Sequence, residues 1–196
     1  MDSAMKQIFR ILSDFSCWTC VPKLGCGNDQ FFNELADNTR PNLTSPIPVK
    51  VCSVNPRSKR PLRKSDSLGQ DSYLLFMAEA GRQFIEEHYS SQVQRYPCES
   101  TESEVWAYSI TNMVANALDL NRSEISYFSS GQIMSVDQFT FIPNVVASKG
   151  IFRINEAPVA LLCDETFVAK WKSARLTGIE FCELWNEGGT VRQKWV

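Results

Sequence analysis

Histidine is almost missing from this chain: His88 is the only one among 196 residues. A Ser-His-Asp or Cys-His catalytic site, or a metal site that uses histidine, would have to include it. His88 follows Glu86 and Glu87 at the end of a predicted helix, where the negative end of the helix dipole favours a cation. We therefore interpret His88 as a structural residue rather than a catalytic one.

The signatures of several enzyme classes are missing as well. The sequence contains no Walker-type glycine loop, no dinucleotide-binding fingerprint and no H-E-x-x-H zinc motif. No apolar run approaches the roughly 20 residues needed to cross a bilayer, and the first residues lack the basic flank and apolar stretch of a secretory signal. These absences predict a cytoplasmic protein that is not an enzyme, needs no cofactor and does not bind a membrane.

A strong charge of one sign is also lacking, since 20 basic and 22 acidic side chains leave a net charge of −2. The balance shifts along the chain, from +4 over residues 1–70 to −6 over residues 71–196. Basic residues concentrate between Arg57 and Lys64, which predicts an exposed mobile loop over residues 56–70. Because no aromatic residues alternate with these basic ones, we predict no direct nucleic-acid binding. The loop could instead meet an acidic patch on a partner.

Seven scattered cysteines, an odd number, suit reduced thiols in a cytosol better than a disulfide framework. Cys17 and Cys20 form a C-x-x-C pair, which can be redox-active at a helix N-terminus or can be half of a zinc site completed by Cys26 and Cys52 or by His88. The segment instead has the pattern of a strand that ends at a proline, and no second paired motif follows. We therefore interpret both as strand cysteines and keep a small thiol-redox or zinc-stabilised protein as the alternative.

Short strands and a few helices predict an α+β fold, with a mixed or antiparallel sheet and two or three helices. Asp164 is a suitable N-cap for one helix, with Glu165 in its first turn, and Gly178 is suited to the left-handed turn that ends it. Helices are predicted over residues 30–36, 78–89 and 165–174, with a short helix or turn at 113–118. The predicted strands cover residues 6–12 and 17–21, paired as a hairpin, and residues 49–54, 72–77, 92–96, 103–110, 133–141, 151–154, 159–162 and 179–183.

Two segments share a strand-helix-strand order. Residues 73–79, YLLFMAE, parallel residues 159–165, VALLCDE, 86 residues later, and a helix and a strand follow each of them. We interpret the protein as a single domain over residues 1–196 and keep a duplicated layout, with lobes 1–100 and 101–196, as an alternative.

The second half of the sequence holds a series of short strings in a set order. They are YSITN at residues 108–112, ALD at 117–119 with Ser123, GQI at 131–133, IFR at 151–153, DE at 164–165 and LTGIEF at 176–181. In the order and spacing of these strings, residues 104–185 resemble a bacterial immunity-protein domain. Genes of that family lie beside those of polymorphic toxins, and the family was first named from a myxobacterial protein. The resemblance implies a protein that neutralises a toxin by binding it.

The favoured hypothesis is therefore an immunity protein that binds a cognate toxin and blocks its active site sterically and electrostatically. Because the sequence lacks a secretory signal, we expect the toxin to act inside the cell, for instance on nucleic acid or nucleotides. The acidic second part of the protein would then face a basic toxin cleft and raise the association rate. The sequence leaves open whether the protein is a monomer or a homodimer.

The last predicted strand indicates where the toxin would bind. Glu180, Glu183 and Glu187 lie on or just after this strand, with Trp185 among them. An aromatic residue surrounded by carboxylates is typical of the anchor and rim of a protein interface, so we predict these four residues as partner-binding. The same charges would also suit an ordinary edge strand that avoids aggregation.

Overall fold

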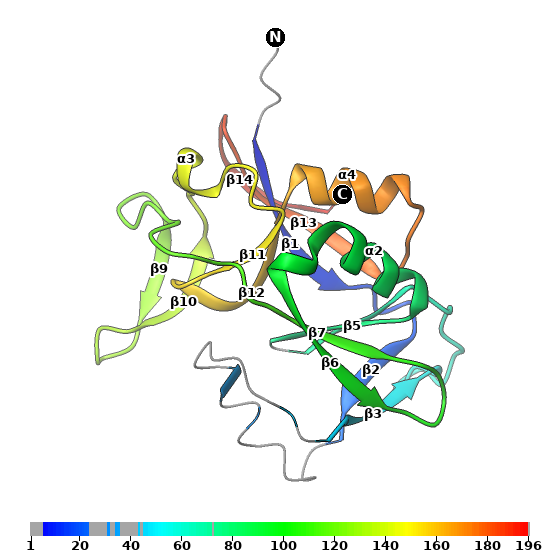
Figure 1. The fold of residues 1–196 in the computed structure, drawn as a ribbon. Helices are drawn as coiled ribbons and strands as arrows, with labels where there is room; N and C mark the ends of the chain where they lie inside the picture. Colours follow the sequence, from blue (N-terminus) through cyan, green and yellow to red (C-terminus); the bar gives the residue numbers. More distant parts are fainter. Residues whose placement is uncertain are drawn as a thin grey trace. The chain divides into compact units, whose positions relative to one another are not determined.

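A computed structural model of the protein (Figure 1) describes residues 6–23, 31, 34–35, 43, 45–71 and 73–195. The predicted turn around Cys26 and most of the helix predicted over residues 30–36 lie outside the described residues. The predicted α+β class is confirmed, since two six-stranded sheets and a separate hairpin are combined with helices. The protein divides into two compact units, and each unit brings together segments that are far apart in the sequence.

The first unit contains Met1–Ile11, Asn112–Lys170 and Phe181–Val196. Its main sheet has the strand order β14-β13-β1-β12-β11-β8. The strands are β1 (Gln7–Ser13), β8 (Met113–Val114), β11 (Ile151–Ile154), β12 (Ala157–Asp164), β13 (Ile179–Asn186) and β14 (Gly189–Trp195), and the helices are α3 (Pro143–Val146) and α4 (Glu165–Ser173). A second, two-stranded sheet of β9 (Glu124–Tyr127) and β10 (Ile133–Gln138) projects as a hairpin (Figure 1).

The second unit contains Leu12–Thr111 and Trp171–Glu180. Its sheet has the order β2-β3-β6-β7-β5-β4. The strands are β2 (Thr19–Pro22), β3 (Ile47–Cys52), β4 (Ser67–Asp71), β5 (Leu74–Met77), β6 (Val93–Glu99) and β7 (Trp106–Ile110). Helix α2 (Glu79–Tyr89) joins β5 to β6 and buries Phe84 and Ile85, and the 3-10 helix η1 (Ser90–Gln92) follows it. The Phe84 ring packs edge-on against Trp171 at a centroid distance of 5.2 Å.

Both predicted strand-helix-strand segments form, and in each unit the two strands flank a third one. β5 and β6 both pair antiparallel with β7, and β12 and β13 lie on either side of β1. The units do not follow the predicted division into residues 1–100 and 101–196, because β1 completes the sheet of the C-terminal segments. The polypeptide passes from one unit to the other within β1, between Thr111 and Asn112, within α4 and within β13.

The start of α4 is as predicted, and its end is not. Asp164 caps the helix, since its Oδ1 accepts a hydrogen bond from the Phe167 N–H at 3.0 Å. The left-handed residue at the C-terminus is Arg175, with φ 56°, rather than Gly178. The N–H of Arg175 donates to the Lys172 carbonyl at 3.0 Å, and the next N–H donates to the Trp171 carbonyl at 3.3 Å. This hydrogen-bond pattern is the Schellman motif, and a residue other than glycine can occupy its left-handed position.

Other predicted elements need correction. β2 pairs with β3 and not with β1, because β1 lies between β12 and β13. Residues 113–118 contain the short strand β8 instead of a helix. Within the predicted loop at residues 56–70, the part from Ser67 onward is strand β4. No helix in the described part of the protein is long and apolar enough to span a membrane.

Candidate partner-binding surface

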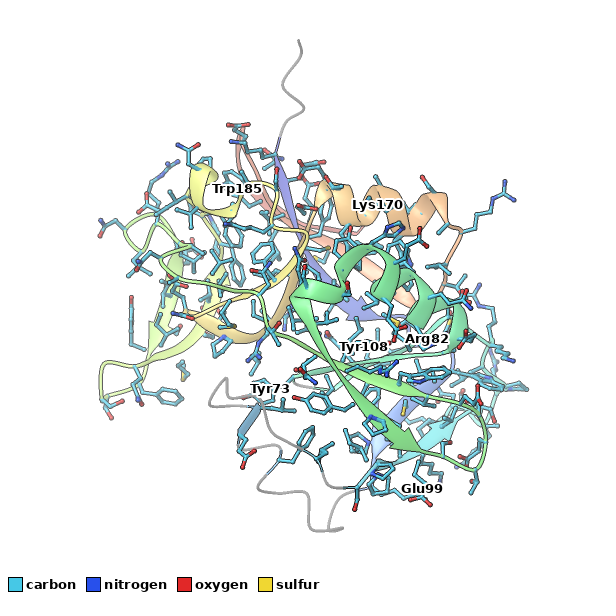
Figure 2. The ribbon with its side chains drawn as sticks, in the orientation of Figure 1. Tyr73, Arg82, Glu99, Tyr108, Lys170 and Trp185 are labelled. Carbon is cyan, nitrogen blue, oxygen red and sulfur yellow. The ribbon has the colours of Figure 1, made fainter. Side chains whose placement is uncertain are left out.

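The four residues predicted to bind a partner lie in different environments. Glu183 and Trp185 are buried, with 5% and 3% of their surface exposed. Glu183 Oε1 accepts hydrogen bonds from Gln7 Nε2 at 3.0 Å and from Asn186 Nδ2 at 3.1 Å. Trp185 (labelled in Figure 2) packs against Phe141, with ring centroids 6.1 Å apart. Neither side chain reaches the surface where a partner would contact it, which corrects the prediction for these two positions.

The last predicted strand also has a neighbour that was not predicted from the sequence. β14 pairs antiparallel with β13, with Glu183 opposite Lys194, and β1 flanks β13 on its other side. β13 is therefore not an edge strand, and every side chain from Phe181 to Trp185 is buried. When both faces of a strand are covered, the alternation of inward and outward residues no longer predicts which side chains are exposed.

The other two predicted residues are exposed, but they do not belong to one unit. Glu180 is in the second unit, whereas Glu187 is in the first and lies 3.9 Å from Lys6 Nζ.

The two units do not differ in net charge, although the two parts of the sequence do. The first unit holds eight basic and nine acidic side chains and the second holds twelve and thirteen, so each has a net charge of −1.

The C-x-x-C pair lies in an environment that opposes thiol chemistry. Cys17 and Cys20 are both buried. Burial, a hydrogen bond to Asp14 and the charge of Asp14 raise the pKa of Cys17, whose Sγ lies 3.2 Å from Asp14 Oδ2. A redox or nucleophilic thiol requires the opposite shift. Within the described residues, which leave out Cys26, no group of three or more His, Cys, Asp or Glu side chains could hold a metal ion.

His88 lies in the last turn of α2, against an aromatic side chain. Its ring meets Phe84 edge-on at a centroid distance of 5.1 Å, and its Nε2 is 3.9 Å from Glu87 Oε1. These contacts fit a structural role at the end of a helix.

The basic segment is partly fixed to its own unit. Arg63 Nη2 contacts Asp14 Oδ2 at 3.1 Å, and Lys64 Nζ lies 5.8 Å from the centre of the Trp18 ring. A nearby hollow of about 510 Å³ is lined by Trp18, Lys64, Asp66, Glu79 and Glu104, among other residues. Asp66 is already bound to Thr177 and Glu79 to Arg82, so the hollow shows no clear ligand chemistry.

The β9–β10 hairpin of the first unit carries several exposed apolar side chains. Tyr127, Phe128 and Met134 cluster near its tip and are 51%, 52% and 54% exposed. The register of the two strands shifts at Met134 and again at Asp137, which indicates two bulges in one short strand. The N–H of Phe128 donates to the Gln132 carbonyl at 2.8 Å and closes the turn. We call residues 124–138 the aromatic hairpin.

A groove of about 340 Å³ begins beside the aromatic hairpin. β10, residue Phe139 and the first part of β12 supply its apolar lining, and Arg10 of β1 and Glu156 add two charged side chains. Arg153 is buried and donates from Nε to the Pro158 carbonyl at 2.6 Å, which fixes the β12 side of the groove. We call this feature the β10–β12 groove; it is lined by Arg10, Ile133, Met134, Ser135, Val136, Phe139, Glu156, Ala157, Pro158, Val159 and Ala160.

A comparison with known protein families matches residues 88–185, half of the chain, to the Immunity protein family (Imm11). The chain belongs to this family. The resemblance predicted from the sequence is therefore confirmed. The search of curated proteins gives no match for the chain. The Imm11 segment runs from the end of α2 into β13 and contains the whole aromatic hairpin, most of the β10–β12 groove and α4.

The aromatic hairpin was missed because its exposure depends on the tertiary fold. Ile133–Phe141 was correctly predicted to contain a strand, but its pairing with residues 124–127 was not. The signal that could have revealed it is Tyr127-Phe128 directly before Ser-Ser-Gly, which places two aromatic rings at a turn.

Proposed function

We propose that this Imm11 protein binds a cognate bacterial toxin and blocks its active site, without catalysing a reaction. Membership of the immunity protein family carries the proposal. Proteins of this kind are generally non-enzymatic, and the raised pKa of Cys17 gives the thiol-redox alternative no support. The role would be protection of a cell during interbacterial competition, in the compartment where the toxin acts, which we propose is the cytoplasm.

We assign the anchor of the toxin interface to the aromatic hairpin. Aromatic side chains are frequent hot spots because each places a large rigid apolar surface against a partner. Tyr127 and Phe128 leave about half of their surface exposed, so covering each ring stabilises the complex by on the order of 1 kcal/mol. A two-stranded hairpin with few long side chains to order also limits the entropy lost on binding.

The exposed carboxylates Glu180 and Glu187 would add electrostatic attraction to a basic toxin cleft. Such a cleft is expected of a toxin that cleaves or modifies nucleic acid or nucleotides. Exposed charges of this kind act mainly on the association rate. The lifetime of the complex with the toxin would then depend on the apolar anchor.

The proposal is tested with the purified toxin domain encoded by the adjoining gene. We expect a double Tyr127→Ser, Phe128→Ser variant to bind this toxin at least tenfold more weakly, because roughly 2 kcal/mol of apolar contact is lost. Isothermal titration calorimetry measures the affinity, and growth of cells that express the toxin measures protection.

The matched control is Phe15→Ser, which removes an aromatic ring that is 76% exposed in the second unit. This control should bind and protect like the unmodified protein. Full protection by the double variant would remove the aromatic hairpin from the interface. No binding by the unmodified protein would refute the immunity function itself.

A further inference from the structure

We propose that two copies of this protein pair through their second units, with a basic turn of each copy set in an acidic hollow of the other. The basic turn is residues 54–61, and the acidic hollow is lined by Pro46 and residues 98–104. Both lie in the second unit. The inference does not depend on the toxin.

The basic turn has a fixed backbone. An antiparallel bridge joins its two ends. Within it, the Asn55 N–H donates to the Arg60 carbonyl and the Lys59 N–H donates to the Asn55 carbonyl, each at 2.9 Å. The Asn55 side-chain oxygen accepts two further hydrogen bonds, from the N–H groups of Arg57 and Ser58 at 3.0 Å. Because the backbone is already ordered, a partner that binds the turn loses less free energy in ordering it.

The three cations of the basic turn have no counter-charge. Arg57, Lys59 and Arg60 are exposed, and none of them forms an ion pair within the described residues. In the same unit, by contrast, Arg63 and Arg82 are both paired with carboxylates. No acidic residue interrupts residues 54–61. The basic turn therefore presents three positive charges to a partner.

The acidic hollow carries the opposite charge. It has a volume of about 420 Å³, and three exposed glutamates border it: Glu99 (labelled in Figure 2), Glu102 and Glu104. The Ser100 hydroxyl holds the Glu102 carboxylate at 2.9 Å. None of the three glutamates forms an ion pair with a described residue. A hollow with three carboxylates matches an exposed turn with three cations, and guanidinium groups pair well with carboxylates.

The turn and the hollow adjoin the same strand. β3 ends at Cys52, two residues before the basic turn, and Glu99 lies opposite Pro48 of β3. A twofold axis that passes between the two features brings the turn of each copy to the hollow of the other. Such a pairing forms both contacts at once.

A second copy fits this surface better than a nucleic acid does. A phosphate backbone would be attracted by the basic turn but repelled by the glutamates of the adjoining hollow. The turn also has no aromatic residue on which a base could stack. A second copy, by contrast, uses the charges of both features.

The first experiment is sedimentation equilibrium of the full-length protein. We expect a dimer with a dissociation constant on the order of 0.1 mM at low ionic strength, weakened at least tenfold in about 0.5 M salt. A turn variant, Arg57→Glu with Arg60→Glu, and a hollow variant, Glu99→Lys with Glu104→Lys, should each lose this dimer. At low micromolar concentrations the protein is then a monomer, so toxin binding measured there reports on single copies. A monomeric unmodified protein at low ionic strength, or an undiminished dimer of the turn variant, would overturn the inference.

The second experiment mixes the turn variant with the hollow variant. The acidic turn of one chain then meets the basic hollow of the other, and the two unchanged features also match, so we expect the dimer to return. The matched control replaces the turn variant with Arg122→Glu, Lys172→Glu, which has the same net charge but alters two exposed residues elsewhere. Equal association in the control mixture would show that net charge alone drives pairing. If a short single-stranded RNA binds the unmodified protein and prevents its dimerisation, but does not bind the turn variant, the turn serves phosphates and the assignment to a second copy is wrong.

Discussion

Glu86 is the side chain around which the charges of helix α2 are arranged. Its Oε1 accepts hydrogen bonds from Tyr108 Oη and Arg95 Nη1, each at 2.9 Å, and its Oε2 pairs with Arg82. Arg82 and Tyr108 are labelled in Figure 2. Partial burial raises the pKa of Glu86, but the Tyr108 and Arg95 hydrogen bonds and the nearby Arg82 charge outweigh it, so the net pKa is lowered.

This lowered pKa predicts a loss of stability in acid. A carboxylate with a lower pKa in the folded state stabilises the fold above its unfolded pKa, 4.5, and the contribution is lost as the pH falls through the folded value. Glu79, whose pKa Arg82 and Gln83 lower to about 2, acts in the same direction. We expect Glu86→Gln to be less stable than the unmodified protein at pH 7 and to lose less stability between about pH 5 and pH 3.

Urea denaturation at several pH values measures this effect. The control is Glu87→Gln, since Glu87 is exposed and its carboxylate lies 3.9 Å from His88 Nε2. It should keep the acid sensitivity of the unmodified protein. Parallel stability curves for Glu86→Gln and the unmodified protein would contradict the role of Glu86.

Residues whose role is local were predicted well from the sequence, and residues whose role depends on distant strands were not. Asp164 precedes an apolar helical pattern, and capping involves only the next three residues. Trp185 and Glu183 have an interface-like composition, but they are buried against residues distant in sequence, Phe141 and Gln7 of β1. Whether a side chain at such a position is buried depends on the tertiary structure, and the composition of the neighbouring sequence does not determine it.

At the scale of elements, the connection between α4 and β13 shows why the Leu-Thr-Gly string matters. Gly178 has φ 93°, in the left-handed region. A Cβ at this position would clash with the Ser67 carbonyl oxygen and approach the Ser65 Cβ. Within the second unit, the same turn is held to other segments by hydrogen bonds from the Ser67 N–H to the Thr177 carbonyl at 3.0 Å and from the Asp14 N–H to the Gly178 carbonyl at 3.2 Å.

We therefore expect Gly178→Ala to destabilise the protein by about 3 kcal/mol, from backbone strain and the steric conflict together. Gly131→Ala is the matched control, because Gly131 also has a positive φ, 83°, but has open space around it. It should cost only about 1 kcal/mol. Urea denaturation measures both, and equal losses would show that the close approach to Ser67 contributes nothing.

Strands were predicted more reliably than their pairing. β3, β5, β11 and β12 lie close to their predicted ranges because apolar and β-branched residues mark them. The partner of β2 was wrong, since nearness in sequence favoured β1 whereas β3 is the partner in the sheet. β14 and β9 were missed because polar residues interrupt them and their stability comes from the neighbouring strand.

At the scale of the whole molecule, charge is distributed evenly between the units although it is uneven along the sequence. Each unit has a net charge of −1, so net charge alone does not favour one unit over the other for a basic partner. We propose that local groups such as Glu180 and Glu187 supply any such attraction.

We expect a Glu180→Lys, Glu187→Lys variant to associate with the toxin domain several-fold more slowly at low salt, and the difference to shrink as ionic strength rises. Stopped-flow fluorescence measures the rate. Glu99→Lys with Glu102→Lys is the matched control, because it makes the same change in net charge at two other exposed glutamates. An equal slowing by both variants would show that net charge alone matters.

The interleaving of the two units also sets an order of events during protein synthesis. The second unit has all its strands once Thr111 has been made, yet it also needs residues 171–180, which the ribosome adds roughly 3–14 s later. The first unit in turn needs β13, which lies beside β1 in the sheet, and β14, which pairs with β13. Each unit therefore completes its fold only after segments far along the sequence have been made.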